Sequence, residues 1–131
     1  MSRYATVNLR DLDDVVGDRA PGIEGRFARE QLASRELGVS LFRYAPGVRS
    51  PFVHSHREQE EAYVVVAGSG RALLDDELIE LRSWDVLRVA PEVVRAFESG
   101  PEGLELLAIG TARPEGGDGV MSQAAWPEDA A

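Results

Sequence analysis

The only two histidines of the chain lie two residues apart, in the run His54-Ser-His56-Arg-Glu-Gln-Glu-Glu61. Alternate side chains of a β-strand point to the same face, so a strand here presents both imidazoles together. Glu61 opens the next apolar run, and a tight connection over residues 57–60 brings its carboxylate to that face. Two imidazoles and one carboxylate suit Fe(II), Mn(II), Ni(II) or Zn(II) and leave coordination positions open for substrate or water. The spacing therefore predicts a metal site formed by His54, His56 and Glu61.

Composition excludes several other chemistries. The chain has no cysteine, and all 14 basic residues are arginine, so thiolate and lysine Schiff-base catalysis are absent. With 23 acidic residues and a net charge of −9, we expect no nucleic-acid partner. No apolar stretch approaches the roughly 20 residues that a membrane span requires. The start of the chain lacks a secretory signal, which, with the missing cysteines, predicts a cytoplasmic protein. Nothing in the sequence implies an organic cofactor.

The elements that must position these residues are short β-rich runs separated by turn residues. The expected strands cover residues 39–45, 62–67, 71–74, 78–82, 86–90, 94–98 and 104–109. Glycine, proline or acidic residues separate them and predict turns at 46–47, 68–70, 75–77, 91–92 and 100–101. Many short strands with such turns are typical of an all-β antiparallel barrel.

A chain of 131 residues is about one domain long. We expect residues 39–110 to form the barrel and residues 1–38 to pack on it or extend it. Within that N-terminal segment, the pattern indicates a brief helical turn over residues 9–16 and a strand over residues 26–32. Residues 111–131 are rich in glycine, proline and acidic residues, which predicts a C-terminal tail.

The first motif of this sequence resembles that of the cupins, in which Gly, a short spacer, His-x-His, three or four residues, Glu, six residues and Gly follow one another. The matching residues are Gly47, His54, His56, Glu61 and Gly68. The spacing from His56 to Gly68 fits, whereas six residues separate Gly47 from His54 where the family pattern has five. The resemblance implies a jelly-roll, double-stranded β-helix barrel that holds a small molecule and forms a homodimer.

The second cupin motif is degraded. A segment of the right shape, WDVLRVAPEVVRAFES, begins after fifteen residues that follow Gly68. The residues at the family's Gly, Pro, Gly, His and Asn positions are Trp84, Ala90, Glu92, Arg95 and Ser99. In the family that histidine is usually the fourth metal ligand, and a guanidinium has no lone pair to replace it. Two roles stay open for Arg95: a bidentate pair with Glu61 that displaces the metal, or recognition of a substrate carboxylate at the mouth of the barrel.

Strand alternation adds two aromatic residues to the expected pocket. Tyr63 shares the face of Glu61, and Phe97 shares the face of Arg95. We therefore expect Arg95, Tyr63 and Phe97 to bind substrate. Tyr63 and Arg95 are the candidates for catalysis, and Tyr63 is the aromatic residue with a proton to transfer.

Three functions are consistent with these residues. In the first, a divalent metal on the triad acts as a Lewis acid or oxygen-activating centre, and Arg95 anchors an anionic group of the substrate; the resemblance implies dioxygenase, isomerase or decarboxylase chemistry. In the second, Arg95 pairs with Glu61, and the barrel is a metal-free ligand carrier or sensor. In the third, supported by the altered second motif, the barrel is kept for assembly.

Overall fold

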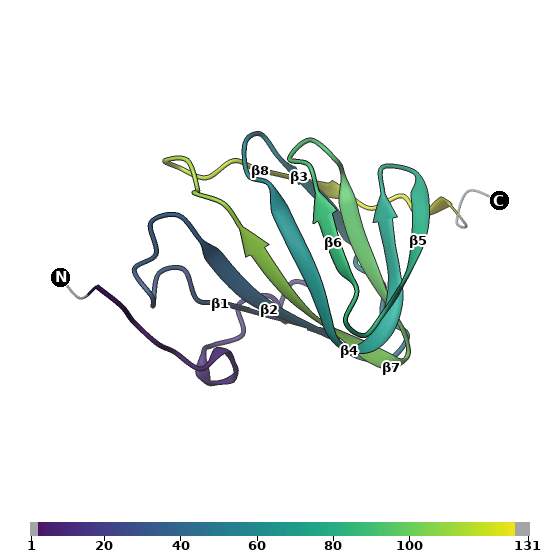
Figure 1. Ribbon diagram of the computed structural model, residues 1–131. Coiled ribbons are helices and arrows are strands. Elements are labelled where there is room, and N and C mark those ends of the chain that lie inside the picture. Colours follow the sequence, from purple (N-terminus) through teal and green to yellow (C-terminus); the bar gives the residue numbers. More distant parts are fainter. Residues whose placement is uncertain (1–2, 128–131) are drawn as a thin grey trace.

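The structure of the protein is a computed structural model that describes residues 3–127. Residues 1–2 and 128–131, the outer ends of the expected N-terminal segment and tail, lie outside the described residues. The regular elements are η1 (Leu9–Asp11), β1 (Ile23–Phe27), β2 (Gly38–Tyr44), β3 (Phe52–His56), β4 (Glu61–Leu74), β5 (Glu77–Arg82), β6 (Val86–Val89), β7 (Arg95–Gly110) and β8 (Gly119–Gln123) (Figure 1). No helix among residues 3–127 is long and apolar enough to cross a bilayer.

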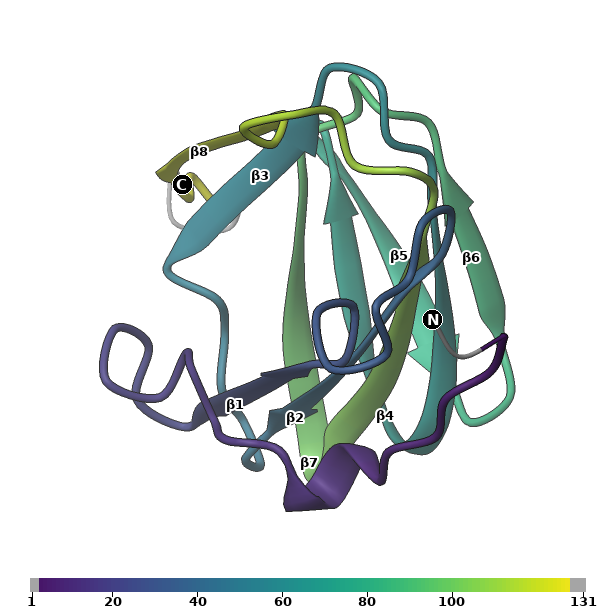
Figure 2. The same cartoon turned by 90° about the vertical axis from the view of Figure 1, so that its left-hand side faces the viewer.

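All strand pairs are antiparallel, and they form one sheet. Its order is β1-β2-β7-β3-β8, and β4 also pairs with β5, β6 and β7. The sheet curls so that β3 and β8 lie opposite β1 and β2, with β4 to β7 forming the wall between them (Figure 2). This arrangement confirms the predicted all-β barrel, whereas the helical turn predicted over residues 9–16 is present only over Leu9–Asp11, as η1.

Two of the predicted turns are wrong, because β4 and β7 are long strands that continue through them. The expected strands 62–67 and 71–74 merge into β4, and 94–98 and 104–109 merge into β7. Pairing between β4 and β7 runs past both glycine-containing segments, with register shifts between Val65 and Ala67 and between Gly68 and Gly70. Gly68 has a φ of +75°, and a Cβ there would collide with the carbonyl oxygen of Gly103. The glycine signal marks a bulge and a close backbone approach instead of a chain reversal.

The terminal segments both add strands to the sheet. β1 pairs with β2 and ends at Phe27, so the strand predicted over residues 26–32 is wrong for most of its length. After Phe27 the chain forms turns up to residue 33, where the backbone N–H of Leu32 bonds to the carbonyl of Ala28. In the segment expected as a tail, β8 pairs with β3, from Phe52 opposite Gln123 to His56 opposite Gly119. The C-terminal segment therefore lies beside the strand that carries both histidines.

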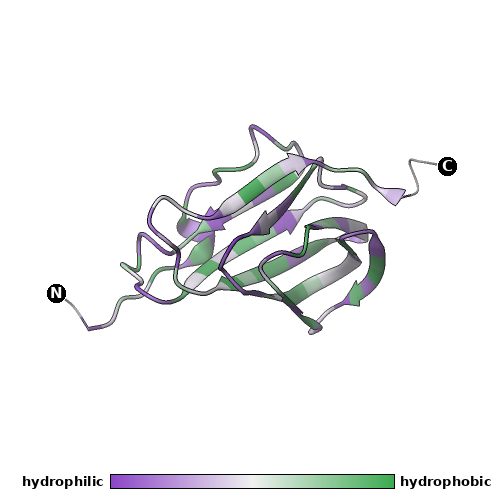
Figure 3. Cartoon of the chain, turned by 90° about the horizontal axis from the view of Figure 1, so that it is seen from above, coloured by the Kyte–Doolittle hydropathy of each residue, from purple (hydrophilic) through white to green (hydrophobic). Residues whose placement is uncertain are grey.

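The barrel interior is filled by alternate residues of the long strands. Tyr63 and Val65 of β4 and Phe97 and Leu106 of β7 belong to the main buried cluster. Buried and half-buried residues alternate over residues 62–66 of β4 and 104–110 of β7, as expected of a sheet with one inner and one outer face, and the sheet as a whole carries both hydrophobic and hydrophilic residues (Figure 3). The core thus fixes which residues of β4 and β7 point inward.

A half-buried ion-pair group links β7 to its neighbours on the outer wall. Glu98 accepts from Arg49 Nε at 2.7 Å and from Arg71 Nε at 3.0 Å. Its side chain is 18% exposed. Burial raises the pKa of Glu98, but the hydrogen bonds from Arg71 and Arg49 outweigh burial, and its pKa lies below the ordinary value.

Glu98→Gln is expected to lower the free energy of unfolding at pH 7 by about 1–2 kcal/mol, because it weakens two charge-assisted hydrogen bonds. A carboxylate with a lowered folded-state pKa contributes stability above its ordinary value of 4.5, and that stability is lost as pH falls through the folded pKa. The difference between parent and variant should therefore shrink in acid. Urea unfolding at pH 7 and at decreasing pH measures it, with the exposed Glu80→Gln as control. A difference that stays constant into acid contradicts the assignment.

Candidate metal centre

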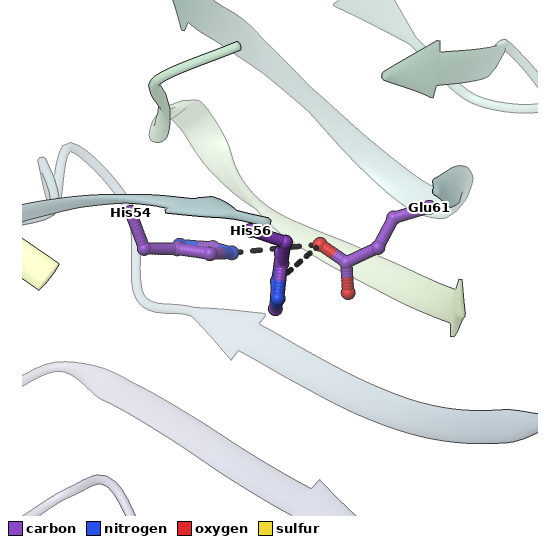
Figure 4. A group of neighbouring side chains, drawn as sticks. All are labelled: His54, His56 and Glu61. Atoms are coloured by element: carbon purple, nitrogen blue, oxygen red, sulfur yellow. Dashed lines mark ion pairs between the residues drawn. The ribbon is translucent and has the colours of Figure 1, made fainter. Parts of the chain in front are cut away.

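The structure brings the three predicted metal ligands together. His54 and His56 project from β3, and Glu61 is the first residue of β4. One ligand atom from each lies within 4.8 Å of the others. Glu61 Oε1 is 3.5 Å from His54 Nε2 and 3.2 Å from His56 Nε2, and both imidazoles face the carboxylate (Figure 4). The imidazole planes are perpendicular, with centroids 5.3 Å apart. This group can hold a metal ion.

Asp118 supports the site from the C-terminal segment, and sequence analysis missed it. Its Oδ1 is 2.9 Å from His56 Nδ1, and its Oδ2 accepts the backbone N–H groups of Glu58 and Gln59 at 2.7 and 2.9 Å. Asp118 is 3% exposed. It therefore holds both the ring of His56 and the connection that leads into Glu61.

The ionised state of Asp118 selects the tautomer of His56. Burial raises the pKa of Asp118, but the hydrogen bonds from Glu58, His56 and Gln59 outweigh burial and lower it to about 2. An ionised carboxylate only accepts hydrogen bonds, so His56 Nδ1 carries the proton. In the neutral ring, the lone pair is then on Nε2, which faces Glu61. This is the arrangement in which an imidazole binds a metal.

The site keeps Glu61 ionised. Burial raises the pKa of Glu61, but its hydrogen bonds with His54, His56 and Tyr63 outweigh burial, and its pKa falls well below the ordinary value. The hydrogen bond with Glu61 raises the pKa of His56, with a smaller contribution from Asp118, against the opposing effect of burial. A metal ion that replaces the proton on His56 Nε2 would also place a positive charge beside Glu61, and His56 Nδ1 would keep its hydrogen bond to Asp118.

Tyr63 and Phe97 lie where strand alternation predicts. The hydroxyl of Tyr63 donates to Glu61 Oε1 at 2.6 Å and lies 3.4 Å from His54 Nε2. Burial, and next the negative charge of Glu61, raise the pKa of Tyr63 well above its ordinary value, so the phenol keeps its proton. The Tyr63 and Phe97 rings are 4.8 Å apart, and both line the cavity in front of the triad.

Arg95 lies behind Glu61 and is fully buried, with 0% exposure. One guanidinium nitrogen, Nη1, donates to the carbonyls of Pro91 and Val93 at 3.1 and 2.7 Å. The other, Nη2, is 3.4 Å from Glu61 Oε1, a single contact instead of a bidentate pair. Among residues 3–127, Nε and Nη2 make no hydrogen bond. Arg95 is not among the residues that line the cavity, so its contact with the site is made through Glu61.

Two cavities border the triad. The first, of about 430 Å³, is lined by all three ligands together with aromatic and aliphatic side chains. The second, of about 550 Å³, shares His56 and Glu61 with the first and includes Arg29, Gln59 and Arg113 in its lining. A small molecule can therefore approach the ligand atoms from inside the barrel.

Comparisons with known proteins agree with this fold. No protein-family model and no curated protein matches the chain significantly. Among solved structures, a cupin protein from Bacteroides fragilis is 28% identical, with a TM-score of 0.70 and coverage of 87% of this chain and 88% of that protein. The polyketide cyclase RemF from Streptomyces resistomycificus is 20% identical, with a TM-score of 0.71 and coverage of 95% and 88%.

A sugar phosphate isomerase of the cupin superfamily from Silicibacter pomeroyi is 16% identical, with a TM-score of 0.70 and coverage of 91% and 92%. Other matching structures include a dioxygenase and a decarboxylase. The matches below 25% identity show the common fold alone. The barrel, the first motif and the similarity to the Bacteroides fragilis cupin protein together identify a single-domain protein with the cupin fold.

Proposed function

We propose that the protein is a metal-dependent enzyme that acts on a small molecule inside the barrel, with His54, His56 and Glu61 as metal ligands. The convergence of the three ligand atoms within 4.8 Å carries this proposal. Its second support is Asp118, which directs the Nε2 lone pair of His56 toward the same point. A divalent Fe, Mn, Ni or Zn ion bound there would supply Lewis-acid or oxygen-activating chemistry.

The other residues of the site have roles that follow from their contacts. Tyr63 holds a proton on its hydroxyl beside Glu61 Oε1, so it can donate a hydrogen bond or a proton to a bound substrate that takes the place of this contact. Phe97 shields the site from water by packing on the Tyr63 ring. Arg95 balances the charge of Glu61 from behind. In this proposal Arg95 acts through Glu61 instead of contacting the substrate.

The reaction belongs to the classes that the family resemblance implies, namely oxygen insertion, isomerisation or decarboxylation. The matching structures include a dioxygenase, a cyclase, a decarboxylase and an isomerase. The fold alone does not choose among these reactions. The homodimer and the cytoplasmic location stay predictions.

The proposal predicts about one metal ion per chain in protein purified without chelators. Glu61→Gln and His54→Ala should contain almost none, because each removes one of three ligands. The neighbouring Glu60→Gln is the control: Glu60 is exposed and pairs with Arg88 on the surface, so this variant should match the parent. Elemental analysis measures the metal content, and circular dichroism confirms that the variants fold.

A metal-free ligand carrier is the second candidate, and the ion pair between Arg95 and Glu61 favours it. In that case the parent protein contains no metal and does not bind added Mn(II) or Zn(II) in a calorimetric titration. Glu61→Gln would then lower the free energy of unfolding without changing metal content. This combination of results contradicts the enzyme proposal.

A further inference from the structure

Aromatic and aliphatic side chains supply most of the lining of the cavity in front of the triad. All four phenylalanines of the chain and two of its three tyrosines line it. These residues are Phe27, Phe42, Phe52, Phe97, Tyr44 and Tyr63. Two ring pairs stiffen the walls: Phe27 and Phe42 meet edge to face at 5.5 Å, and Tyr63 packs on Phe97 at 4.8 Å. Aromatic walls with this geometry favour flat, apolar groups.

The mouth of the cavity is also apolar. Phe27, Phe52, Val120 and Met121 line it and are 45%, 38%, 46% and 63% exposed. Apolar side chains that remain exposed around a concave surface are typical of a ligand-binding site. β3 and β8 supply three of these four residues, so the strand that carries the histidines also forms one lip of the opening.

The polar residues of the lining include Arg19, Ser40 and Ser50 and one cluster around the carboxylate of Glu61. His54, His56, Glu61 and the Tyr63 hydroxyl are within contact of one another there. The buried guanidinium of Arg95 is outside the lining. A bound molecule would therefore place its apolar part against the aromatic walls and its oxygen atoms against the triad.

We propose that the cavity binds a ring-bearing, largely apolar small molecule that presents two neighbouring oxygen atoms, as hydroxyl or keto-enol groups, to the metal triad. Three protein ligands leave adjacent coordination positions open, which two neighbouring oxygens can fill. This second part rests on the proposed function, whereas the preference for an apolar ring rests on the walls alone. The substrate class thus differs from the carboxylate-bearing molecule that the sequence predicts with Arg95 as its anchor, because Arg95 does not line the cavity and the one arginine that does, Arg19, is exposed.

Isothermal titration of the full chain, metal-free and zinc-loaded, tests both parts. The probes are naphthalene-2,3-diol, which carries a ring and two neighbouring hydroxyls, and tartrate, which carries two neighbouring hydroxyls and two carboxylates without a ring. We expect the zinc-loaded protein to bind the diol at least about tenfold more tightly than tartrate, and more tightly than the metal-free protein binds it. Equal binding of diol and tartrate overturns the ring preference. Equal binding of the diol with and without zinc overturns the orientation of its oxygens toward the metal.

Variants of the mouth locate the binding site. Phe27→Ala combined with Phe52→Ala should weaken binding of the diol about tenfold or more, since both rings lose contact with it. The control is Ile79→Ala on β5, because Ile79 is 38% exposed like Phe52 and does not line the cavity; this variant should bind as the parent does. Undiminished binding by the double variant overturns the proposal.

Zinc binding shows whether the barrel holds a metal at all. Sedimentation velocity shows whether the mouth of the cavity is a dimer interface instead of a ligand site. If zinc does not bind at all, the proposed function fails, and the metal-free titration still tests the ring preference. Sedimentation velocity of the parent and of the double variant tests whether a second copy of the chain covers the apolar mouth. A parent dimer that dissociates in the double variant places the mouth in an interface and overturns the ligand proposal.

Discussion

Arg95→Met is expected to lower the free energy of unfolding of the metal-free protein by about 3–5 kcal/mol. Methionine keeps much of the buried volume but removes the charge whose Nη2 lies 3.4 Å from Glu61 Oε1. Glu61 then remains ionised and largely buried, with 16% of its side chain exposed, and keeps its contacts with His54, His56 and Tyr63 but loses the guanidinium charge. The carbonyls of Pro91 and Val93 also lose the hydrogen bonds donated by Arg95. Urea unfolding in the presence of a chelator measures the loss.

A double-mutant cycle with Glu61→Gln isolates the ion pair. Once Glu61 is neutral, removing the guanidinium no longer exposes a charge to an apolar environment, so the double variant should lose about 1–3 kcal/mol less than the sum of the single variants. Arg88→Met is the control, because Arg88 pairs with Glu60 at the surface, where the side chains are 68% and 52% exposed. That change should cost less than about 1 kcal/mol. Additive single effects would show that Arg95 and Glu61 are not coupled.

Arg95→Met also distinguishes the two proposed functions. A divalent metal on the triad supplies positive charge beside Glu61, so saturating zinc should restore much of the stability that Arg95→Met loses. Removing the like charge of the guanidinium should also tighten zinc binding by about tenfold or more. If Arg95→Met instead abolishes zinc binding while the fold is retained, Arg95 is needed to position Glu61. If neither protein binds zinc, the ion pair is a structural feature of a metal-free barrel.

Local pattern was sufficient to predict the triad because its geometry depends on short-range rules. His54 and His56 occupy alternate positions of one strand, and Glu61 begins the next strand after a four-residue connection. Strand alternation also places Tyr63 beside Glu61, as the 2.6 Å hydrogen bond between them confirms. None of these relations requires knowledge of distant parts of the chain.

Features that depend on distant pairing could not be predicted in this way. The glycines at 68 and 100 resemble turn residues locally, yet β4 and β7 pair on both sides of these segments, because each long strand supplies the other with a partner over most of its length. The position of Arg95 depends on the path of a long side chain through the core, which strand parity does not determine. Asp118 lies 62 residues after His56, and only the pairing of β8 with β3 brings the two together.

Asp118→Asn is expected to weaken metal binding about 10- to 100-fold while largely preserving the fold. The backbone N–H groups of Glu58 and Gln59 both point at Oδ2, so the asparagine amide should place its oxygen there. Its NH₂ group then faces His56 Nδ1, which must accept a hydrogen bond. The ring proton is therefore expected to move to Nε2, where it occupies the lone pair that faces the triad.

Nitrogen-15 NMR of the histidine side chains, recorded on metal-free protein above the raised pKa of His56, reports this tautomer independently of the metal. The parent should carry the proton on Nδ1 and Asp118→Asn on Nε2, and calorimetric titration with Zn(II) should show the weaker binding. Asp118→Ala is the matched comparison: it removes the acceptor of the Glu58 and Gln59 N–H groups as well, so it should lower the melting temperature more than Asp118→Asn does. If Asp118→Asn keeps the tautomer of the parent but binds zinc less tightly, the role of Asp118 is to hold the connection before Glu61. If Asp118→Asn changes the tautomer and also binds zinc less tightly, the negative charge of Asp118 keeps the proton of His56 on Nδ1 and so leaves Nε2 free for the metal.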